Sequence, residues 1–307
     1  IPTSTAAYPL TDAGRYADLT GQAHAQGFKP LESSDPSAML TACGYRYQAD
    51  AVWTVTDARQ RLSRFITQHA NNYGQMRDMM AQPGTSQLSP YLRFGLISIR
   101  ECAAKALKAG ADKWLSELIW REFYAMILYY FPESVDKEWN PKYREVLDWS
   151  HNQDHLDAWK QGRTGYPVVD AAMRQLLTEG WMHNRARMVV ASFLTKHLRI
   201  DWRAGEAHFA QLLMDYDMAS NVGGWQWAAS TGTDAQPYFR VFNPMLQSEK
   251  FDPKGEYIRK YVPELREVKG EAIHAPWTQK FRLDYPSPIV DHASAREKAI
   301  AMFKAAG

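Results

Sequence analysis

The spacing of apolar residues restricts the fold of this chain more than any other feature of its sequence. From Ala58 onward, the alternation typical of strands is scarce, and apolar residues instead recur three or four positions apart. In the segment 112–132, for example, Leu115, Leu118 and Ile119 form one apolar stripe. Comparable helical patterns occupy 57–78, 84–107, 165–181, 181–202 and 205–221. The sequence therefore predicts a mainly α fold.

Capping residues mark several of the expected helix ends. Asp57 is expected to cap the N-terminus of the first helical segment. Ser89 followed by Pro90 is the usual order of an N-cap and a first helical residue. Gly180 is expected to end the helix before it, and the helix of 205–221 is expected to be continuous.

Hydroxyl residues cluster just ahead of the helix start at Ser89. Thr85, Ser86 and Ser89 place hydroxyls and backbone N–H groups there, and a helix N-terminus with such neighbours suits a phosphate group. An ordinary capped helix accounts for the same residues. From this segment alone the ordinary helix is the favoured explanation, because Ser-Pro starts are common.

The bulk composition is that of a soluble globular protein. The chain has 307 residues, of which 45% are hydrophobic, enough for one large domain or two ordinary ones. The net charge is only +2, so an anionic partner has to be met by a local basic patch. No apolar run approaches the roughly 18 residues of a membrane-spanning helix, and no secretory signal opens the chain. We expect a soluble, intracellular (cytoplasmic) monomer that does not bind membranes.

The sequence shows no spacing typical of a metal site. Cys43 and Cys102 form no CxxC pair and are expected to be buried free thiols. His183, next to Asn184, has no second histidine or carboxylate at ligand spacing. We therefore expect no bound metal.

The N-terminal part differs from the rest of the chain. Proline and glycine recur through the first 50 residues and break any long helical period. A short helix could begin at Asp35 and Pro36. We expect residues 1–70 to form a linker-like segment with short helices, and residues 71–307 to form the helical functional domain.

The stretch from Asp215 to Pro244 combines carboxylates, glycines and large aromatic residues. Asp215 and Asp217 come first, the glycine pair at 223–224 follows, and Trp225 and Trp227 come next. Glycine lets the backbone approach a ligand closely, and tryptophan offers a large flat face with one N–H donor. Room for a flat partner and a plain buried core explain this composition about equally well.

The segment 112–132 also has a second, polar face. Glu117, Trp120, Arg121 and Tyr124 are spaced to lie together on one side of that helix. This face either lines a cavity or carries an exposed Glu117–Arg121 pair of little energetic consequence. On the segment 181–202, Arg185 and Arg187 could bind phosphates, although a solvated basic face is favoured for either residue alone.

Four long motifs then stand in one order along the chain: WLSELIWREFY, TGYPVVDAAMRQL, GWMHNRARMVVASFLTKHLRIDWR and GGWQWAASTGTDAQPYFRVFNP. Together they resemble the flavin-binding domain of class I cyclobutane pyrimidine dimer DNA photolyases, in the photolyase and cryptochrome family. The resemblance runs from about residue 71 to the end. It implies an all-helical domain that holds a folded FAD, with the reduced form active, and it shifts each open choice above toward function.

The resemblance assigns cofactor contacts by matching position. The residues that it implies for FAD are Tyr73, Thr85, Ser86, Gln87, Leu88, Ser89, Trp114, Asn184, Arg187, Asp215, Asp217 and Asn221. Arg187 is expected to pair with Asp215, since a buried charge needs a partner. Asn221 matches the residue that faces flavin N5, and its amide can both donate and accept.

The resemblance also implies a lesion pocket and an electron relay. The pocket wall for a flipped-out dimer would comprise Glu117, Trp120, Asn184, Met188 and Trp227, and the flanking phosphates would meet Arg77, Arg121, Arg185 and Arg240. The relay from the surface to the flavin would comprise Trp149, Trp202 and Trp225. Core packing is the alternative for each of these three tryptophans.

The implied activity is that of a deoxyribodipyrimidine photo-lyase, which splits pyrimidine dimers in UV-damaged DNA with light. Glu117 is expected to assist by a hydrogen bond to a thymine carbonyl. The family's usual α/β antenna domain has no counterpart in residues 1–70, so no second, light-harvesting chromophore is expected. Two rivals stay open: a cryptochrome-like FAD photoreceptor without repair activity, and a helical DNA-binding module without cofactor.

Overall fold

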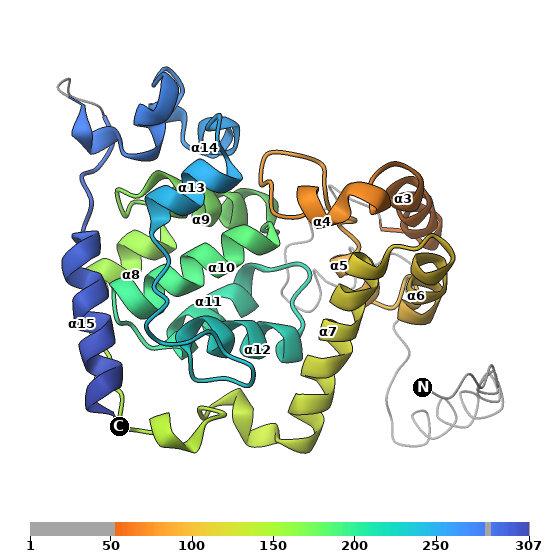
Figure 1. Cartoon of the computed structure of the whole chain (residues 1–307), viewed down its shortest axis with the longest axis horizontal. Coiled ribbons are helices and arrows are strands. Elements are labelled where there is room, and N and C mark those ends of the chain that lie inside the picture. Colours follow the sequence, from red (N-terminus) through yellow and green to blue (C-terminus); the bar gives the residue numbers. More distant parts are fainter. Residues whose placement is uncertain (1–52, 280–283, 307) are drawn as a thin grey trace, which may run out of the picture. The chain divides into compact units, whose positions relative to one another are not determined.

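Helices supply the regular structure of this protein. The computed structural model describes residues 53–279 and 284–306 (Figure 1). Its α-helices are α3 (Val55–Gln68), α4 (Tyr73–Met76), α5 (Ser89–Arg93), α6 (Ile99–Lys108), α7 (Asp112–Tyr130), α8 (Gln153–Lys160), α9 (Pro167–Glu179), α10 (Asn184–Ser192), α11 (Trp202–Leu212), α12 (Met218–Ala229), α13 (Pro244–Phe251), α14 (Glu256–Tyr261) and α15 (His292–Ala305). One π-helical turn, η4 (Phe193–His197), follows α10. Those described residues contain no strand, so the predicted mainly α fold is confirmed. They also contain no helix with both the length and the apolar character to cross a membrane.

The buried apolar side chains form two main clusters. The first, which we term the α3–α7 core, includes Leu62, Phe65 and Trp114. The second, which we term the α8–α14 core, is built around α9, α10, α11 and α12. Helix α10 packs against both α9 and α12 (Figure 1). Helix α7 packs on α6 in the first core and on α12 in the second, so it joins the two.

The helical unit begins earlier in the chain than the expected boundary at residue 71. The contacts group the chain from Trp53 onward into one compact unit. The rings of Phe65 on α3 and Trp114 on α7 lie 4.8 Å apart, so α3 shares its core with the rest of the domain. Cys102 is a buried free thiol, as expected. The expectations for residues 1–52, including a short helix near Asp35 and a buried Cys43, lie outside the described residues.

The helix ends follow the expected chemistry, with shifts in position. Thr54, not Asp57, caps α3: the Asp57 N–H donates to Thr54 Oγ1 at 3.0 Å, and the Thr54 hydroxyl donates back to the Asp57 carboxylate at 2.6 Å. Ser89 is the first residue of α5, one position later than its predicted capping role, and Pro90 is the second. Gly180 ends α9 in the left-handed conformation, as expected.

The predicted continuous helix over 205–221 is interrupted. Helix α11 ends at Leu212, and α12 begins at Met218 with Asp217 as its N-cap. A tertiary contact explains the break, because the Met214 N–H donates to the Gly180 carbonyl at the end of α9 at 2.8 Å. Asp215 and Asp217 therefore project from a short connection between two helices.

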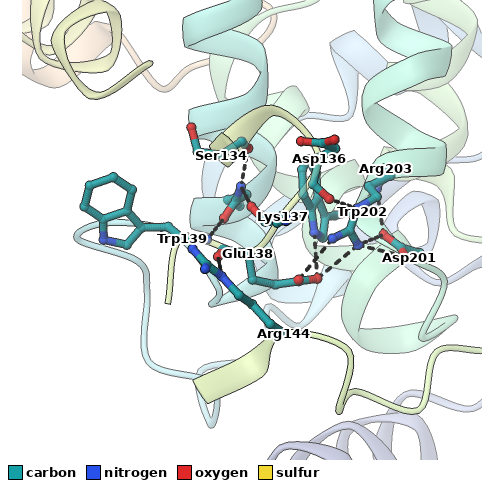
Figure 2. Close-up of polar contacts among 10 residues, drawn as sticks. Ser134, Asp136, Lys137, Glu138, Trp139, Arg144, Asp201, Trp202 and Arg203 are labelled. Atoms are coloured by element: carbon teal, nitrogen blue, oxygen red, sulfur yellow. Dashed lines mark hydrogen bonds and ion pairs between the residues drawn. The ribbon is translucent and has the colours of Figure 1, made fainter. Parts of the chain in front are cut away.

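Buried polar contacts fasten the loop after α7 to α11 and α12 (Figure 2). The Gln226 amide on α12 donates to the carbonyls of Ser134 at 2.8 Å and Lys137 at 2.9 Å. Glu138 accepts two hydrogen bonds from Arg203, each of 3.0 Å, and one from the Trp202 indole N–H at 3.4 Å. The Gln226 contacts thereby hold the C-terminal half of α12 against the loop that follows α7.

Candidate functional site

A cavity of about 720 Å³ lies between the two cores. Its wall comes from α7, α10, α12, the connection before α12 and the segment 73–93. All twelve residues that the sequence predicted for the cofactor line it, from Tyr73 to Asn221. Of the predicted lesion and phosphate residues, all except Arg240 line it as well. Arg240 is exposed in the loop between α12 and α13.

The predicted pair of Arg187 and Asp215 is present in this wall. One guanidinium nitrogen of Arg187 lies 2.8 and 3.0 Å from the two Asp215 carboxylate oxygens. Its Nε donates to the Met182 carbonyl at 2.8 Å. Only 2% of the Asp215 side chain is exposed, so the arginine compensates a buried charge. The pair ties the start of α10 to the connection before α12.

The polar face of α7 turns toward the cavity. Glu117, Trp120, Arg121 and Tyr124 all line it, so the cavity-lining alternative holds. The alternative of a Glu117–Arg121 pair is wrong, because each residue has another partner. Glu117 forms a two-pronged ion pair with Arg77, and Arg121 lies 3.2 Å from Asp217. Each pair links residues far apart in the sequence, which spacing along one helix cannot reveal.

Four ion pairs account for all the acidic groups that line the cavity. Besides the three pairs above, Arg185 lies 2.8 Å from Asp78. Two basic residues of the wall, Arg93 on α5 and Lys113 at the start of α7, form no ion pair with a carboxylate of the described residues. The sequence argument missed both cations, although both stand at helix ends where a charge can point past the helix. They leave the wall with an excess of positive charge.

The phenols of the wall are neutral. Burial raises the pKa of Tyr73 to about 12 and that of Tyr124 to about 12. Both side chains can therefore donate a hydrogen bond at any physiological pH. The Arg77 guanidinium also lies over the Tyr73 ring, 5.4 Å from its centre.

Asn221 presents one end of its amide to a neighbour on α11. Its Nδ2 donates to the Glu206 backbone carbonyl at 3.2 Å and to the Glu206 carboxylate at 3.0 Å. With both N–H groups directed there, the amide oxygen is the group available to the cavity. The expectation that this amide both donates to and accepts from a flavin stays a prediction. Glu206 was missed because it stands on another helix.

The three predicted relay tryptophans occupy different surroundings. Trp225 on α12 lines the cavity and contacts the Phe209 ring edge-on at 5.0 Å. Trp202 at the start of α11 is fully buried, and its indole N–H faces Glu138 (Figure 2). Trp149 is half-buried, with its ring 6.5 Å from that of Phe303. All three pack in or against the α8–α14 core, and the relay stays a prediction.

Comparison with known proteins identifies the family. The model of the FAD binding domain of DNA photolyase matches residues 114–305, more than half of the chain. The chain belongs to this family. It is 50% identical to a deoxyribodipyrimidine photo-lyase of Alkalihalophilus pseudofirmus, over 93% of this chain and 62% of that protein. It is 51% identical to the deoxyribodipyrimidine photo-lyase of Escherichia coli, over 89% of this chain and 61% of that protein.

Solved structures agree with this assignment. A bacterial class III photolyase from Agrobacterium tumefaciens superposes with a TM-score of 0.79 at 40% identity, covering 92% of this chain and 60% of that one. A cryptochrome of Synechocystis sp. PCC6803 superposes with a TM-score of 0.79 at 30% identity, covering 89% and 61%. The chain thus spans about three fifths of the length of these photolyase-family proteins.

The cavity of this family member fits FAD in size and in donor chemistry. Its volume of about 720 Å³ lies within the usual range for cofactor pockets. Arg93 and Lys113 supply cations that no carboxylate of the described residues neutralises, and Thr85 and Ser86 add hydroxyls to the same wall. Helix α5 has only five residues, so these side chains, more than a helix dipole, suit a diphosphate. At Gly224 a side-chain methyl would meet nothing within 4 Å, so the wall is open there.

Proposed function

We propose that this chain carries the light-driven repair of cyclobutane pyrimidine dimers in DNA, with reduced FAD as cofactor. One observation carries the proposal. The residues expected to hold the flavin and those expected to hold the lesion line a single cavity, although they come from α7, α10, α12 and the segment 73–93. Reduced FAD, when bound, would supply a photoexcited electron to the dimer and take it back after the ring has opened, so the reaction has no net redox change.

The side chains of the wall bind and orient the two partners. Arg187, paired with Asp215, and Asn221, held by Glu206, present a fixed polar edge to the flavin. Trp120 and Trp227 supply flat faces for the two extruded pyrimidines. Trp120 is 38% exposed, so the aromatic part of the wall is reachable from solvent.

Glu117 has a more specific role in the proposal than the sequence suggested. A carboxylate that pairs with Arg77 on both oxygens can only accept hydrogen bonds. It is therefore suited to the ring N–H of a thymine, whereas the expected bond to a thymine carbonyl would need a donor.

The other parts of the proposal follow from these assignments. Because described residues of one chain alone line the cavity that we propose for both partners, we propose a monomer. Because the substrate is cellular DNA, we propose that the protein acts inside the cell. No described residue carries an argument for a second chromophore, so the expected absence of an antenna pigment stays a prediction.

The test uses the purified chain and a duplex oligonucleotide that carries one thymine dimer. The absorption spectrum of the purified chain comes first, and we expect a flavin spectrum; a colourless protein that takes up no added FAD would leave only the cofactor-free DNA-binding module. The reduced protein is then illuminated with blue light beside a dark control, and the dimer is quantified. We expect dimer loss in the light alone. A flavin spectrum without dimer loss would favour the cryptochrome-like photoreceptor.

A pair of variants tests Glu117. Glu117→Gln keeps the size of the side chain but removes the charge that pairs with Arg77, and Glu117→Ala removes the group. We expect both to retain FAD and to lower the repair yield per absorbed photon several-fold at saturating DNA, with the larger loss for alanine. Repair yields equal to that of the unaltered protein would remove Glu117 from the reaction.

A further inference from the structure

Asp78 joins two arginines of the cavity wall, and neither the motifs nor the spacing of the sequence drew attention to it. Its Oδ2 lies 2.8 Å from Arg185 Nη2, and its Oδ1 lies 3.8 Å from Arg77 Nε. About a quarter of the Asp78 side chain is exposed, whereas the two arginine side chains are 16% exposed. One carboxylate thus faces two guanidinium groups that are largely withdrawn from water.

The two arginines approach Asp78 from different parts of the fold. Arg77 follows α4, which contributes to the α3–α7 core, and Arg185 is the second residue of α10 in the α8–α14 core. The ion pair of Asp78 with Arg185 therefore links the two cores within the wall of the cavity. Without Asp78, the described residues contain no carboxylate that pairs with Arg185.

Each guanidinium has one further contact besides Asp78. Arg77 is held on its far side by the two-pronged pair with Glu117. Arg185 stacks over the Phe251 ring, 4.3 Å from its centre. Its Nε is buried and has no hydrogen-bond partner in the described part of the chain. Because the Arg185 Nε is buried, the donors that remain for a phosphate are the second N–H groups on the terminal nitrogens of the two arginines.

Because Asp78 is negatively charged, its effect on net charge and its effect on the arginines predict opposite changes in DNA affinity. A carboxylate in the wall of a site for DNA repels phosphates, so simple charge counting says that its removal should strengthen DNA binding. If Asp78 aligns two arginines with the DNA, however, its removal should weaken binding of the damaged DNA. The two effects can be separated because nonspecific binding responds to net charge, whereas binding of an extruded lesion needs donors at fixed positions.

We propose that Asp78 is a positioning residue for damaged DNA, which sets the planes of Arg77 and Arg185 toward the phosphates that flank the flipped-out dimer. The proposal rests on the proposed function and adds to it the residue that aligns the phosphate contacts. Asp78 itself makes no contact with the lesion or the flavin in this assignment.

The test compares Asp78→Asn with a matched control, Asp234→Asn. Both changes remove one negative charge. Asp234 lies in the loop after α12, close enough to influence the cavity residue Tyr124, and its carboxylate pairs with no arginine of the described residues. Its backbone is left-handed, with φ of 48°, which asparagine tolerates. Dissociation constants are measured with dimer-containing and undamaged duplexes over a range of salt concentrations.

We expect Asp78→Asn to weaken binding of the dimer-containing duplex about tenfold and to lower its salt slope by about one, while binding of undamaged DNA stays equal or becomes tighter. Asp234→Asn should not weaken binding of the dimer-containing duplex or of undamaged DNA. The FAD absorbance of both variants should match that of the unaltered protein. Asp78→Glu, which keeps the charge, should recover part of the lost affinity.

A double-variant cycle decides whether Asp78 acts through Arg185. If it does, Asp78→Asn should cost little further affinity in an Arg185→Ala background. Fully additive losses, equal behaviour of Asp78→Asn and Asp234→Asn, or loss of FAD or thermal stability in Asp78→Asn would each overturn the assignment. An unaltered chain that binds damaged and undamaged DNA equally would instead contradict the proposed function itself.

Discussion

At the scale of single residues, two adjacent glycines on α12 show how identical side chains acquire different roles. A Cβ at Gly223 would lie 2.2 Å from the ring of Tyr124 on α7, whereas a Cβ at Gly224 would meet nothing within 4 Å. The sequence suggested that this glycine pair lets the backbone approach a flat ligand. Gly223 instead lets α12 approach α7, and only Gly224 lines the cavity. The two positions therefore offer a matched pair of substitutions.

We expect Gly223→Ala to destabilise the protein by about 1–3 kcal/mol, because the Tyr124 ring has to move to make room. Gly224→Ala should be neutral or should stabilise the protein by up to about 1 kcal/mol, since alanine is the better helix former and its methyl group meets no neighbour. Urea unfolding of the two variants without added cofactor gives both values. A Gly223→Ala variant as stable as Gly224→Ala would contradict the close packing of α7 on α12.

At the scale of elements, a buried lysine joins η4, α12 and α15. Lys196 Nζ donates to the Ala229 carbonyl at 3.1 Å and to Ser230 Oγ at 2.9 Å, at the C-terminus of α12. It also lies 3.6 Å from the centre of the Phe303 ring on α15. Burial lowers the pKa of Lys196 well below its ordinary value of 10.5. The C-terminus of the cavity helix α12 is thus held by a group whose charge is costly.

This arrangement predicts a pH-dependent effect of Lys196→Met. The variant leaves the Ala229 carbonyl without its partner, which should cost about 1–3 kcal/mol. The folded protein binds fewer protons at Lys196 than the unfolded chain does between the lowered pKa and 10.5. The wild-type contribution of Lys196 therefore grows as pH rises toward 10.5 and shrinks as pH falls. The stability gap between wild type and variant should be larger at pH 9 than at pH 7.

Urea unfolding at the two pH values measures this gap, and Lys304→Met, at an exposed position on α15, serves as the control. A gap that stays constant between pH 7 and pH 9 would contradict a Lys196 pKa lowered well below 10.5.

At the scale of the whole molecule, two buried histidines and one partly buried histidine make the fold sensitive to acid. Burial lowers the pKa of His183, which caps α10, to about 4. It lowers that of His208 on α11 to about 4. His197 in η4, whose Nε2 lies 2.8 Å from His292 Nδ1 on α15, has its pKa lowered to about 3 by burial and by that second imidazole. These three groups stay neutral in the folded state under mildly acidic conditions.

Acidification destabilises the folded protein through these three histidines. Below the ordinary histidine pKa of 6.5, these three histidines bind protons in the unfolded chain but not in the folded protein. The free energy of unfolding therefore falls as the pH drops from 6.5 to about 4. Each histidine contributes a limiting slope of about 1.4 kcal/mol per pH unit. Urea unfolding at pH 7, 6 and 5 should show this loss. His208→Gln should reduce it, whereas His151→Gln, at an exposed position, should not. Equal slopes in the two variants would contradict the assignment for His208.

Much of the site could be anticipated from residue order, and the rest could not. The residues that the resemblance implied for the flavin and for the lesion line one cavity, whereas Arg240 does not, and their roles stay predictions. The ion-pair partners of two of these residues could not be predicted. Glu117 and Arg121 are four apart on one helix, yet they pair with Arg77 and Asp217, at separations of 40 and 96 residues. Asp78 and Glu206 carried no motif, so nothing in their local sequence marked them.

The amino-acid sequence by itself determined that this chain folds into helices, which residues stand on each helical face, and which family its motifs resemble. Only the tertiary structure decided which charges meet, where the helix before Asp215 breaks, and which of two adjacent glycines packs against another helix. The reason is physical. Helical periodicity is a property of neighbouring residues, whereas an ion pair, a steric contact or a burial cost depends on segments that folding brings together from distant parts of the chain.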